Sequence, residues 1–307
     1  MTPNISVVIP VKDEEKNIPI LTVQLRKIFS KLKKSYEIIF IDDGSRDNSC
    51  DVIEKLHKKD SRVRIISFRK NFGKALAYKA GFSLAKGDII ITIDGDLQDD
   101  PAEIPSFIKK IEEGYDVVVG WKWERNDNFE KRAFSKIFNV LVFLLSRLRL
   151  HDIDCGYRAM RSRVCRDLPL HGGLYRFIPV LAYEQGYSVS EIKVKHFSRM
   201  HGKSKYRFGR IFSGFFDLIT AKFFISYIKN PMHLFGPIGL IFLVTGFLTG
   251  ILLLYDKIRG FEIGERPLLI LTILLLIMGI QFISIGLLGE SIAYHQGEED
   301  YKIRKIL

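Results

Sequence analysis

Two long apolar runs near the C-terminal end of the 307-residue chain constrain its fold more than any other feature. Residues 235–255 comprise 21 positions without a charged side chain, and residues 267–289 comprise 23 more. A helix rises about 1.5 Å per residue, so either run spans about 30 Å, the thickness of the hydrocarbon core of a bilayer. The connection at 256–266 is short and charged. The pattern therefore predicts a transmembrane hairpin.

The rest of the chain has the composition of a soluble protein. Its 47 Lys and Arg against 35 Asp and Glu give a net charge of +12, and hydrophobic residues make up 47%. This mixture excludes a disordered chain, and the ordinary charge content of the first 230 residues excludes a polytopic transporter. We predict a globular domain over 1–206, amphipathic helices lying in the membrane interface over 207–232, the hairpin over 233–290 and a tail over 291–307.

Short runs rich in Val and Ile alternate with helical patterns through the first 120 residues. Strands that are buried on both faces have this composition. The predicted strands are 5–10, 36–41, 63–68, 88–93 and 115–119, and the predicted helices between them are 17–34, 47–59, 74–85 and 101–113. This alternation predicts an α/β fold with a doubly wound, mostly parallel sheet. Further on we expect helices at 129–149 and near 174–185, and a strand near 188–197.

Acidic residues follow three of the predicted strands. Glu14 lies just beyond the first strand, Asp42 and Asp43 end the second, and Asp94 and Asp96 follow the fourth. Ligands of open parallel sheets bind beyond the carboxyl ends of the strands, so these side chains should share one crevice. Because unpaired carboxylates repel one another, a cation should lie among them.

The pattern Asp94-Gly95-Asp96 is the sharpest of these signals. Two carboxylates two residues apart, with a glycine that lets the backbone bend, can hold one hard divalent cation. Mg²⁺ in particular prefers one or two carboxylates together with water and substrate phosphate oxygens. The loop therefore predicts one half of a diphosphate-binding site, in which Mg²⁺ or Mn²⁺ would bridge the two carboxylates and the diphosphate.

Two other nucleotide-binding patterns are excluded. The first strand is not followed by Gly-x-Gly-x-x-Gly, which a dinucleotide site needs. The stretch Gly202-Lys203-Ser204 resembles the end of a P-loop, but Phe197 occupies the place of its first glycine. A nucleic-acid partner is also excluded, because the basic segment 193–210 adjoins the membrane helices and no nucleic-acid-binding module is present.

Several motifs together resemble glycosyltransferase family 2, and within it the polyprenyl-phosphate sugar transferases. The resemblance covers nearly the whole chain and rests on the order and spacing of its motifs. These are Ile-Pro-Val-Lys-Asp-Glu-Glu-Lys-Asn at 9–17, Ile-Asp-Asp-Gly-Ser at 41–45, Asn71-Phe72-Gly73-Lys74, Asp-Gly-Asp-Leu-Gln-Asp-Asp-Pro at 94–101, and Arg199-x-x-Gly202-x-Ser204-Lys205. The resemblance implies a GT-A fold, a nucleotide-sugar donor, a divalent metal and a polyprenyl phosphate acceptor.

The resemblance also implies roles for individual residues. Five residues would bind the nucleotide sugar: Pro10, Glu14, Asp42, Asp43 and Gln98. Asp94 and Asp96 would bind the metal, and Arg199 and Lys205 would close over the diphosphate. Lys131 and Ser135 would hold the acceptor phosphate. A third acceptor group would be Lys122 or Arg125, because Gly120-Trp121-Lys122 stands where the family has Gly-Ser-Arg.

The segment 151–158 resembles the family's Asp-x-x-x-Gly-aromatic-Arg motif. Asp152 matches its leading Asp and would act as a base or orient the acceptor, and Asp154 is an additional carboxylate. The alternative is a structural turn that is salt-bridged to Arg158. Catalytic roles are thus expected for Asp96, Asp152, Arg199 and Lys205.

We expect a membrane-anchored, inverting and metal-dependent enzyme that transfers a hexose, from UDP-glucose or GDP-mannose, to undecaprenyl or dolichyl phosphate. Transfer to a lipid or glycan hydroxyl is one alternative, and a non-catalytic membrane scaffold is another. The first residues do not form a signal peptide, and the three cysteines fit a reducing compartment. Both ends should therefore face the cytosol at a bacterial inner membrane or its equivalent, and homo-oligomerisation stays open.

Overall fold

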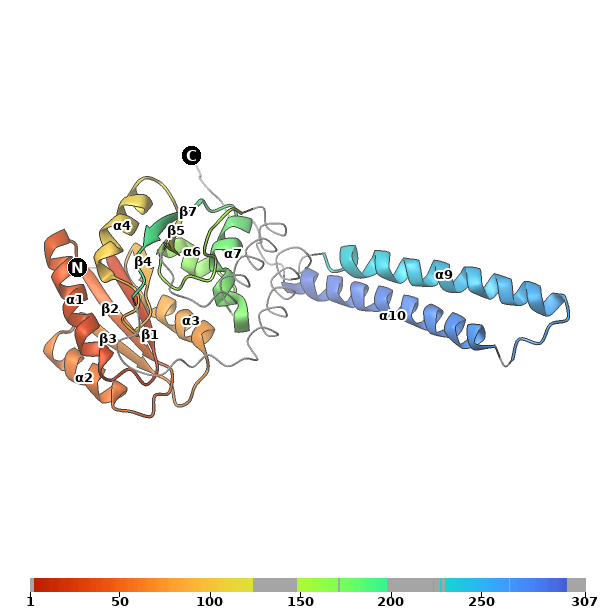
Figure 1. Cartoon of the computed structure of the whole chain (residues 1–307), viewed down its shortest axis with the longest axis horizontal. Helices are drawn as coiled ribbons and strands as arrows, with labels where there is room; N and C mark the ends of the chain where they lie inside the picture. The colour runs from red at the N-terminus through yellow and green to blue at the C-terminus, as the bar shows by residue number, and fades with distance from the viewer. Residues whose placement is uncertain are drawn as a thin grey trace. The chain divides into compact units, whose positions relative to one another are not determined.

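A computed structural model describes residues 3–123, 148–170, 172–197, 223, 227, 230–264 and 266–296. The chain divides into two compact units, Met1–Leu218 and Ile219–Leu307 (Figure 1). The helix predicted at 129–149 lies outside the described residues except for Leu148 and Arg149, which are not helical. Nearly all of the predicted interfacial segment 207–232 also lies outside them, as do residues 297–307.

The first unit is built on a seven-stranded sheet in the order β3-β2-β1-β4-β6-β5-β7. The strands are β1 Ile5–Val11, β2 Tyr36–Asp42, β3 Val63–Ser67, β4 Ile89–Thr92, β5 Val117–Lys122, β6 Arg158–Arg161 and β7 Val189–Val194. β1 is parallel to β2 and β4, and β2 is parallel to β3. The five predicted strands are therefore present, and their Val and Ile side chains are largely buried in all of them except the edge strand β3.

Helices connect the parallel strands, as the alternating pattern predicts. They are α1 Asn17–Leu32, α2 Ser49–Lys59, α3 Lys74–Leu84, η1 Pro101–Glu103, α4 Ile104–Glu112, α6 Ser162–Asp167, η2 Gly172–Phe177 and α7 Ile178–Glu184. α3 packs so closely on the sheet that a Cβ at Gly81 would lie 2.5 Å from the Val8 side chain. The resulting doubly wound fold gathers the carboxyl ends of β1, β2 and β4 at one edge (Figure 1).

One strand was not predicted. β6 is antiparallel to both β4 and β5 and separates them, and β5 is in turn parallel to β7. Its sequence, Arg-Ala-Met-Arg, has only four residues and a charged residue at each end, so it lacks the apolar run that marks the other strands. Arg158 is nevertheless fully buried. Its two terminal nitrogens donate hydrogen bonds to the carbonyls of Tyr175 (2.9 Å) and Ile153 (3.4 Å), and its buried Nε has no partner among the described residues.

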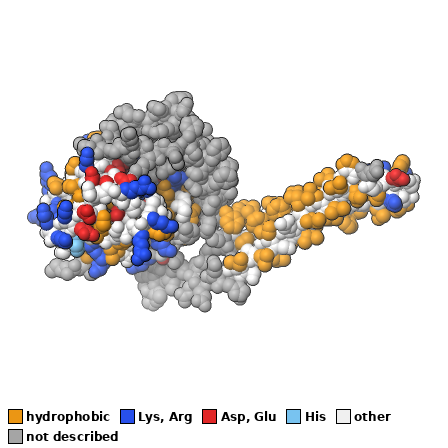
Figure 2. Space-filling model, turned by 90° about the horizontal axis from the view of Figure 1, so that it is seen from below, with side chains coloured by type: hydrophobic (Ala, Val, Ile, Leu, Met, Phe, Trp, Pro, Cys, Tyr) orange, Lys and Arg blue, Asp and Glu red, His pale blue; other side chains and the backbone are white. Residues whose placement is uncertain are grey.

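The second unit contains α9, Met232–Ile258, and α10, Pro267–Gln296, which are long and apolar enough to cross a membrane. The two predicted membrane helices are therefore present, each a few residues longer than its apolar run. Hydrophobic side chains cover the described surface along both helices, and charged ones gather at the connection (Figure 2). The helices approach closely at Gly239 and Gly279, and the hydroxyls of Thr249 and Thr272 lie 3.0 Å apart.

Candidate active site

The acidic loop after β4 lies at the carboxyl edge of the sheet, beside the ends of β1 and β2. A Cβ at Gly95 would lie 2.7 Å from the side chain of Val11, the last residue of β1. Val11 in turn accepts a hydrogen bond of 2.9 Å from the backbone N–H of Asp43. The three acidic strand ends therefore meet, as the parallel sheet predicts.

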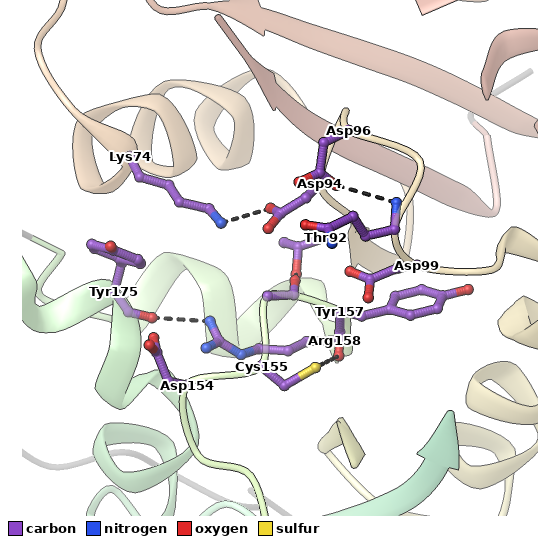
Figure 3. A network of polar contacts seen from close by, with 12 residues as sticks. Lys74, Thr92, Asp94, Asp96, Asp99, Asp154, Cys155, Tyr157, Arg158 and Tyr175 are labelled. Carbon is purple, nitrogen blue, oxygen red and sulfur yellow. Dashed lines mark hydrogen bonds and ion pairs between the residues drawn. The ribbon is translucent and has the colours of Figure 1, made fainter. Parts of the chain in front are cut away.

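Asp94 is bound by a lysine that the sequence analysis left without a role. The Lys74 ammonium at the start of α3 lies 2.6 Å from Asp94 Oδ1 (Figure 3). Burial acts to lower the pKa of Lys74, but the Asp94 carboxylate raises that pKa well above its ordinary value. The ammonium is therefore charged and supplies a cation that the cluster of acidic strand ends requires. In the sequence, Lys74 is marked only by the motif Asn71-Phe72-Gly73-Lys74. This motif supports the family resemblance but does not indicate the contact with Asp94.

The backbone from Asp96 to Gln98 connects the acidic loop to the end of β7. The backbone N–H of Gln98 donates to Asp96 Oδ1 at 3.3 Å, and Leu97 between them has a φ of 60°, the left-handed conformation that bends the loop. The N–H of Phe197 donates to the Gln98 carbonyl at 2.8 Å, and the Gln98 side chain donates back to Phe197 at 3.3 Å. The chain beyond β7 is thus held against this loop.

Asp99 is a buried carboxylate that the sequence analysis missed. Its Oδ1 lies 3.1 Å from the ammonium of Lys122 and 3.2 Å from Nδ1 of His196. Burial acts to raise the pKa of Asp99, but Lys122 and His196 hold that pKa below its ordinary value. Burial likewise acts to lower the pKa of Lys122, and the carboxylates of Asp99, Asp94 and Asp152 raise it. Lys122 is expected to bind the acceptor phosphate. It therefore interacts electrostatically with the acidic cluster as well.

The two predicted nucleoside-binding residues of β2 also shape the loops around them. Asp42 accepts hydrogen bonds from the backbone N–H of Ser45 and from the hydroxyl of Ser67, both at 3.0 Å. Asp43 accepts from the backbone N–H groups of Phe72 and Gly73 at 2.7 and 3.0 Å. Both carboxylates are buried and hold neighbouring loops at the edge of the sheet where a nucleotide is expected.

The predicted residues from the end of β1 lie at the same edge. Pro10 pairs in register with Ile41, directly before Asp42. Glu14 begins the turn into α1, where its backbone N–H donates to the Ser49 hydroxyl at 2.9 Å and its carbonyl accepts from Asn17 at 2.9 Å. The first two strand ends therefore form one wall of the site.

The turn before β6 separates its two carboxylates. Asp152 is buried, whereas the Asp154 side chain is 49% exposed and lies 3.8 Å from Arg176. Arg158 holds this turn through the Ile153 carbonyl. Asp152 also acts electrostatically on Lys122, the partner of Asp99. Burial and this interaction distinguish Asp152 from the half-exposed Asp154.

Five predicted residues lie outside the described part of the chain: Arg125, Lys131, Ser135, Arg199 and Lys205.

The donor set of the acidic loop fits a hard divalent cation. Asp94 and Asp96 supply carboxylate oxygens, which suit Mg²⁺ and Mn²⁺. Gly156 leaves room beside them, since a Cβ there would lie 3.1 Å from both oxygens of Asp94. Among the described residues, no group of three or more His, Cys, Asp or Glu side chains could hold a metal. This pair would therefore leave most of the coordination shell to substrate oxygens and water.

The mostly parallel seven-stranded sheet, with β6 antiparallel between β4 and β5, is a GT-A-like fold. The described fold resembles the crystal structure of glucosyl-3-phosphoglycerate synthase from Mycobacterium tuberculosis in complex with Mn²⁺, uridine diphosphate and phosphoglyceric acid. The TM-score is 0.56 at 18% identity, and the match covers 72% of this chain and 78% of that one. At this identity the likeness establishes the fold.

Residues 6–168 match glycosyl transferase family 2, and residues 230–294 match the GtrB C-terminal hairpin. The chain therefore belongs to glycosyltransferase family 2, and its two apolar helices anchor it in a membrane. It is 34% identical to dodecaprenyl-phosphate galacturonate synthase of Rhizobium johnstonii, over 98% of this chain and 92% of that protein. It is 38% identical to undecaprenyl-phosphate 4-deoxy-4-formamido-L-arabinose transferase of Shewanella sediminis, over 94% and 86%.

Proposed function

We propose that this glycosyltransferase moves a sugar from a nucleotide sugar to a polyprenyl phosphate at the cytosolic face of a membrane. The observation that carries the proposal is the convergence of Asp43 and Asp94 at one sheet edge, beside the Gly156 turn that follows Asp152, in a chain that also has the GtrB hairpin. Both relatives described above are named for sugar transfer to a polyprenyl phosphate. The predicted interfacial helices at 207–232 would keep the site at the bilayer surface.

In the proposed reaction, a phosphate oxygen of the acceptor attacks the anomeric carbon of the sugar. The new carbon–oxygen bond forms as the bond to the nucleoside diphosphate breaks, which inverts the configuration. Asp94 and Asp96 would hold a divalent cation, which would supply positive charge to the leaving diphosphate. Arg199 and Lys205 would add to that charge, and Lys122, Lys131 and Ser135 would orient the acceptor phosphate.

The ionisation of the acceptor determines how much a general base contributes. The second pKa of a phosphate monoester is about 6, so at pH 7 the nucleophile is already largely ionised. A base normally contributes about 10²–10⁴-fold. Asp152 would therefore orient the acceptor more than deprotonate it. A hydroxyl acceptor would instead require a base.

The identity of the donor sugar is tested directly. UDP-glucose and GDP-mannose are the donors expected from the sequence, and the names of the relatives add nucleotide-activated galacturonate and 4-deoxy-4-formamido-L-arabinose. The full chain in detergent is incubated with each donor, Mg²⁺ or Mn²⁺, and undecaprenyl phosphate. The mass of the lipid product, determined by mass spectrometry, identifies the sugar that is transferred. Undecaprenol, which lacks the phosphate, is the matched control lipid. Glycosylation of undecaprenol instead of undecaprenyl phosphate would contradict the proposal.

A pair of variants gives a second test of the phosphate acceptor. Asp152→Asn should retain more activity than Asp96→Asn, because the ionised phosphate needs little help from a base. Asp154→Asn removes the exposed neighbouring carboxylate and should stay within about twofold of wild type, as surface changes usually do. If Asp152→Asn is as inactive as Asp96→Asn, a hydroxyl acceptor becomes the better interpretation.

A further inference from the structure

The Asp99 carboxylate joins three segments that are distant in the sequence. Its side chain is 1% exposed, and its Oδ1 contacts both Lys122 at the end of β5 and His196 beyond β7. Asp99 and His196 also form a backbone bridge, and the adjacent Gln98 and Phe197 exchange two hydrogen bonds. The acidic loop, β5 and the chain beyond β7 are therefore connected at this one residue.

The other oxygen of Asp99 indicates that this arrangement serves more than stability. Within the described part of the chain, Oδ2 is buried and has no hydrogen-bond partner. A buried acceptor without a partner is unfavourable, and apolar residues of similar volume often replace buried ion pairs without loss of stability. A carboxylate in this place is better explained by the groups that it holds.

Those groups lead to the two substrate sides of the proposed reaction. Lys122 is one of the residues proposed to bind the acceptor phosphate, and its ammonium is held by Asp99. His196 and Phe197 hold the end of β7 against the acidic loop, which is proposed to bind the metal on the donor side. Figure 3 shows the Asp99 carboxylate beside the Asp94–Asp96 loop that carries the metal-binding pair. Asp99 thus contacts both the acceptor cation and the end of β7 that lies against the acidic loop.

We propose that Asp99 is a positioning residue for the transfer reaction, which holds the Lys122 ammonium toward the acceptor and, through His196, the end of β7 against the acidic loop on the donor side. The inference rests on the proposed function and deepens it. Displacement of a substrate-binding group by about 1 Å can reduce the rate about 100-fold, so loss of this carboxylate should affect both substrates.

The variants separate the two roles of Asp99. Asp99→Asn keeps the shape of the side chain and removes its charge. His196→Leu removes the nitrogen that contacts Asp99, whereas His196→Asn keeps a donor close to the position of Nδ1. Asp100→Asn is the matched control, because it removes the neighbouring charge from a carboxylate that caps η1 through the Ala102 N–H, and Asn caps equally well.

Two measurements on the full chain in detergent report separately on acceptor binding and on nucleotide binding. Steady-state kinetics with varied undecaprenyl phosphate gives the acceptor KM. Calorimetric titration with Mn²⁺ and UDP or GDP, whichever the wild type binds, gives a nucleotide Kd without any acceptor. Asp99→Asn should raise both constants about tenfold. His196→Leu should raise the Kd about tenfold and leave the KM within about twofold, and His196→Asn should restore the Kd.

The outcomes that would overturn the proposal are distinct. One is a fall in the melting temperature of Asp99→Asn with both constants unchanged, which would assign Asp99 a structural role. Others are equal effects in Asp100→Asn, or His196→Asn binding the nucleotide as weakly as His196→Leu. If Asp99→Asn does not fold, the two His196 variants decide the question. If wild type glycosylates no polyprenyl phosphate, the proposed function fails, and the nucleotide titration still tests the link from Asp99 to the donor side.

Discussion

At the scale of single residues, the carboxylates of the site divide by what they contact. Asp42 and Asp43 bind backbone N–H groups and thereby hold the loops at the edge of the sheet. Asp94 instead pairs with the ammonium of Lys74. Substitution should therefore have different effects. At Asp42 or Asp43 it should reduce the stability of the loops, and at Asp94 it should reduce turnover.

Asp96→Asn tests the metal-binding role of the acidic loop. The change removes an anionic ligand from a loop at the edge of the sheet, so we expect turnover to fall by about 100-fold or more while the fold is retained. EDTA should reduce wild-type activity in the same way, and added Mn²⁺ or Mg²⁺ should restore it. Circular dichroism and the melting temperature verify folding. Full activity of the wild type in metal-free buffer would contradict the prediction.

At the scale of elements, the strands are joined by a buried network at the edge opposite the site. Glu37 of β2 accepts hydrogen bonds from the Ser6 hydroxyl of β1 at 2.6 Å, from the Lys86 backbone N–H at 2.7 Å and from Arg64 of β3 at 2.7 Å. Burial acts to raise the pKa of Glu37, but these donors hold that pKa below its ordinary value. The network therefore stabilises the sheet when Glu37 is ionised.

Glu37→Gln should make the stability of the sheet less dependent on pH. Since the folded pKa is lowered, the contribution of Glu37 is fully present above the unfolded pKa of about 4.3 and is lost as the pH falls through the folded value. At pH 7 we expect the variant to lose about 1–3 kcal/mol, because one buried donor remains unsatisfied. Thermal unfolding followed by the fluorescence of Trp121 and Trp123 measures the difference. A gap between variant and wild type that does not narrow below about pH 4 would argue against this prediction.

The membrane hairpin depends on close contact between α9 and α10. A Cβ at Gly279 would lie 2.6 Å from Leu243 and 2.9 Å from the Gly239 carbonyl, so Gly279→Ala should separate the helices. Gly250→Ala is the control, because its Cβ would meet Thr272 at an ordinary 3.6 Å. The test is disulfide formation between cysteines placed at Thr249 and Thr272, in a background without native cysteines, as SDS is added. We expect Gly279→Ala to lose the cross-link at a lower SDS concentration, and equal behaviour of the two variants would be inconsistent with this packing.

At the scale of the whole molecule, the anchor determines where the chemistry takes place. Two membrane helices return the chain to the side from which it entered, so the first unit and the tail should share the cytosolic side. The basic segment that precedes α9 agrees, because Lys and Arg concentrate on the cytosolic side of membrane helices. The connection at 259–266 should then lie outside.

Thiol labelling of intact cells tests this orientation. We expect a cysteine at Gly264 to react with a membrane-impermeant reagent, because a side chain there meets nothing within 4 Å and its backbone is not left-handed, unlike that of Gly260 at a φ of 88°. The native Cys50, which is half-buried in the first unit, is the internal control and should react only after the cells are opened. Labelling of Cys50 in intact cells, together with protection at position 264, would show that the protein has the opposite orientation.

The amino-acid sequence by itself determined the elements whose signals are local. Continuous Val and Ile runs identified β1 to β5, and uncharged segments longer than 20 residues identified the hairpin. The sequence also predicted the acidic edge, because the carboxyl ends of parallel strands meet in any sheet of this kind. The predicted site roles remain proposals that await the experiments above.

Tertiary structure decided what depends on contacts between distant residues. It inserted β6 between β4 and β5, although four residues with arginine at both ends carry no strand signal. It brought Lys74 to Asp94 across 20 positions and His196 to Asp99 across 97. Such pairs leave no periodicity in the sequence, because their geometry depends on how the helices and loops pack against the sheet. The acidic loop of this site could therefore be identified from the sequence. Its contacts with Lys74 and His196 could be identified only in the folded structure.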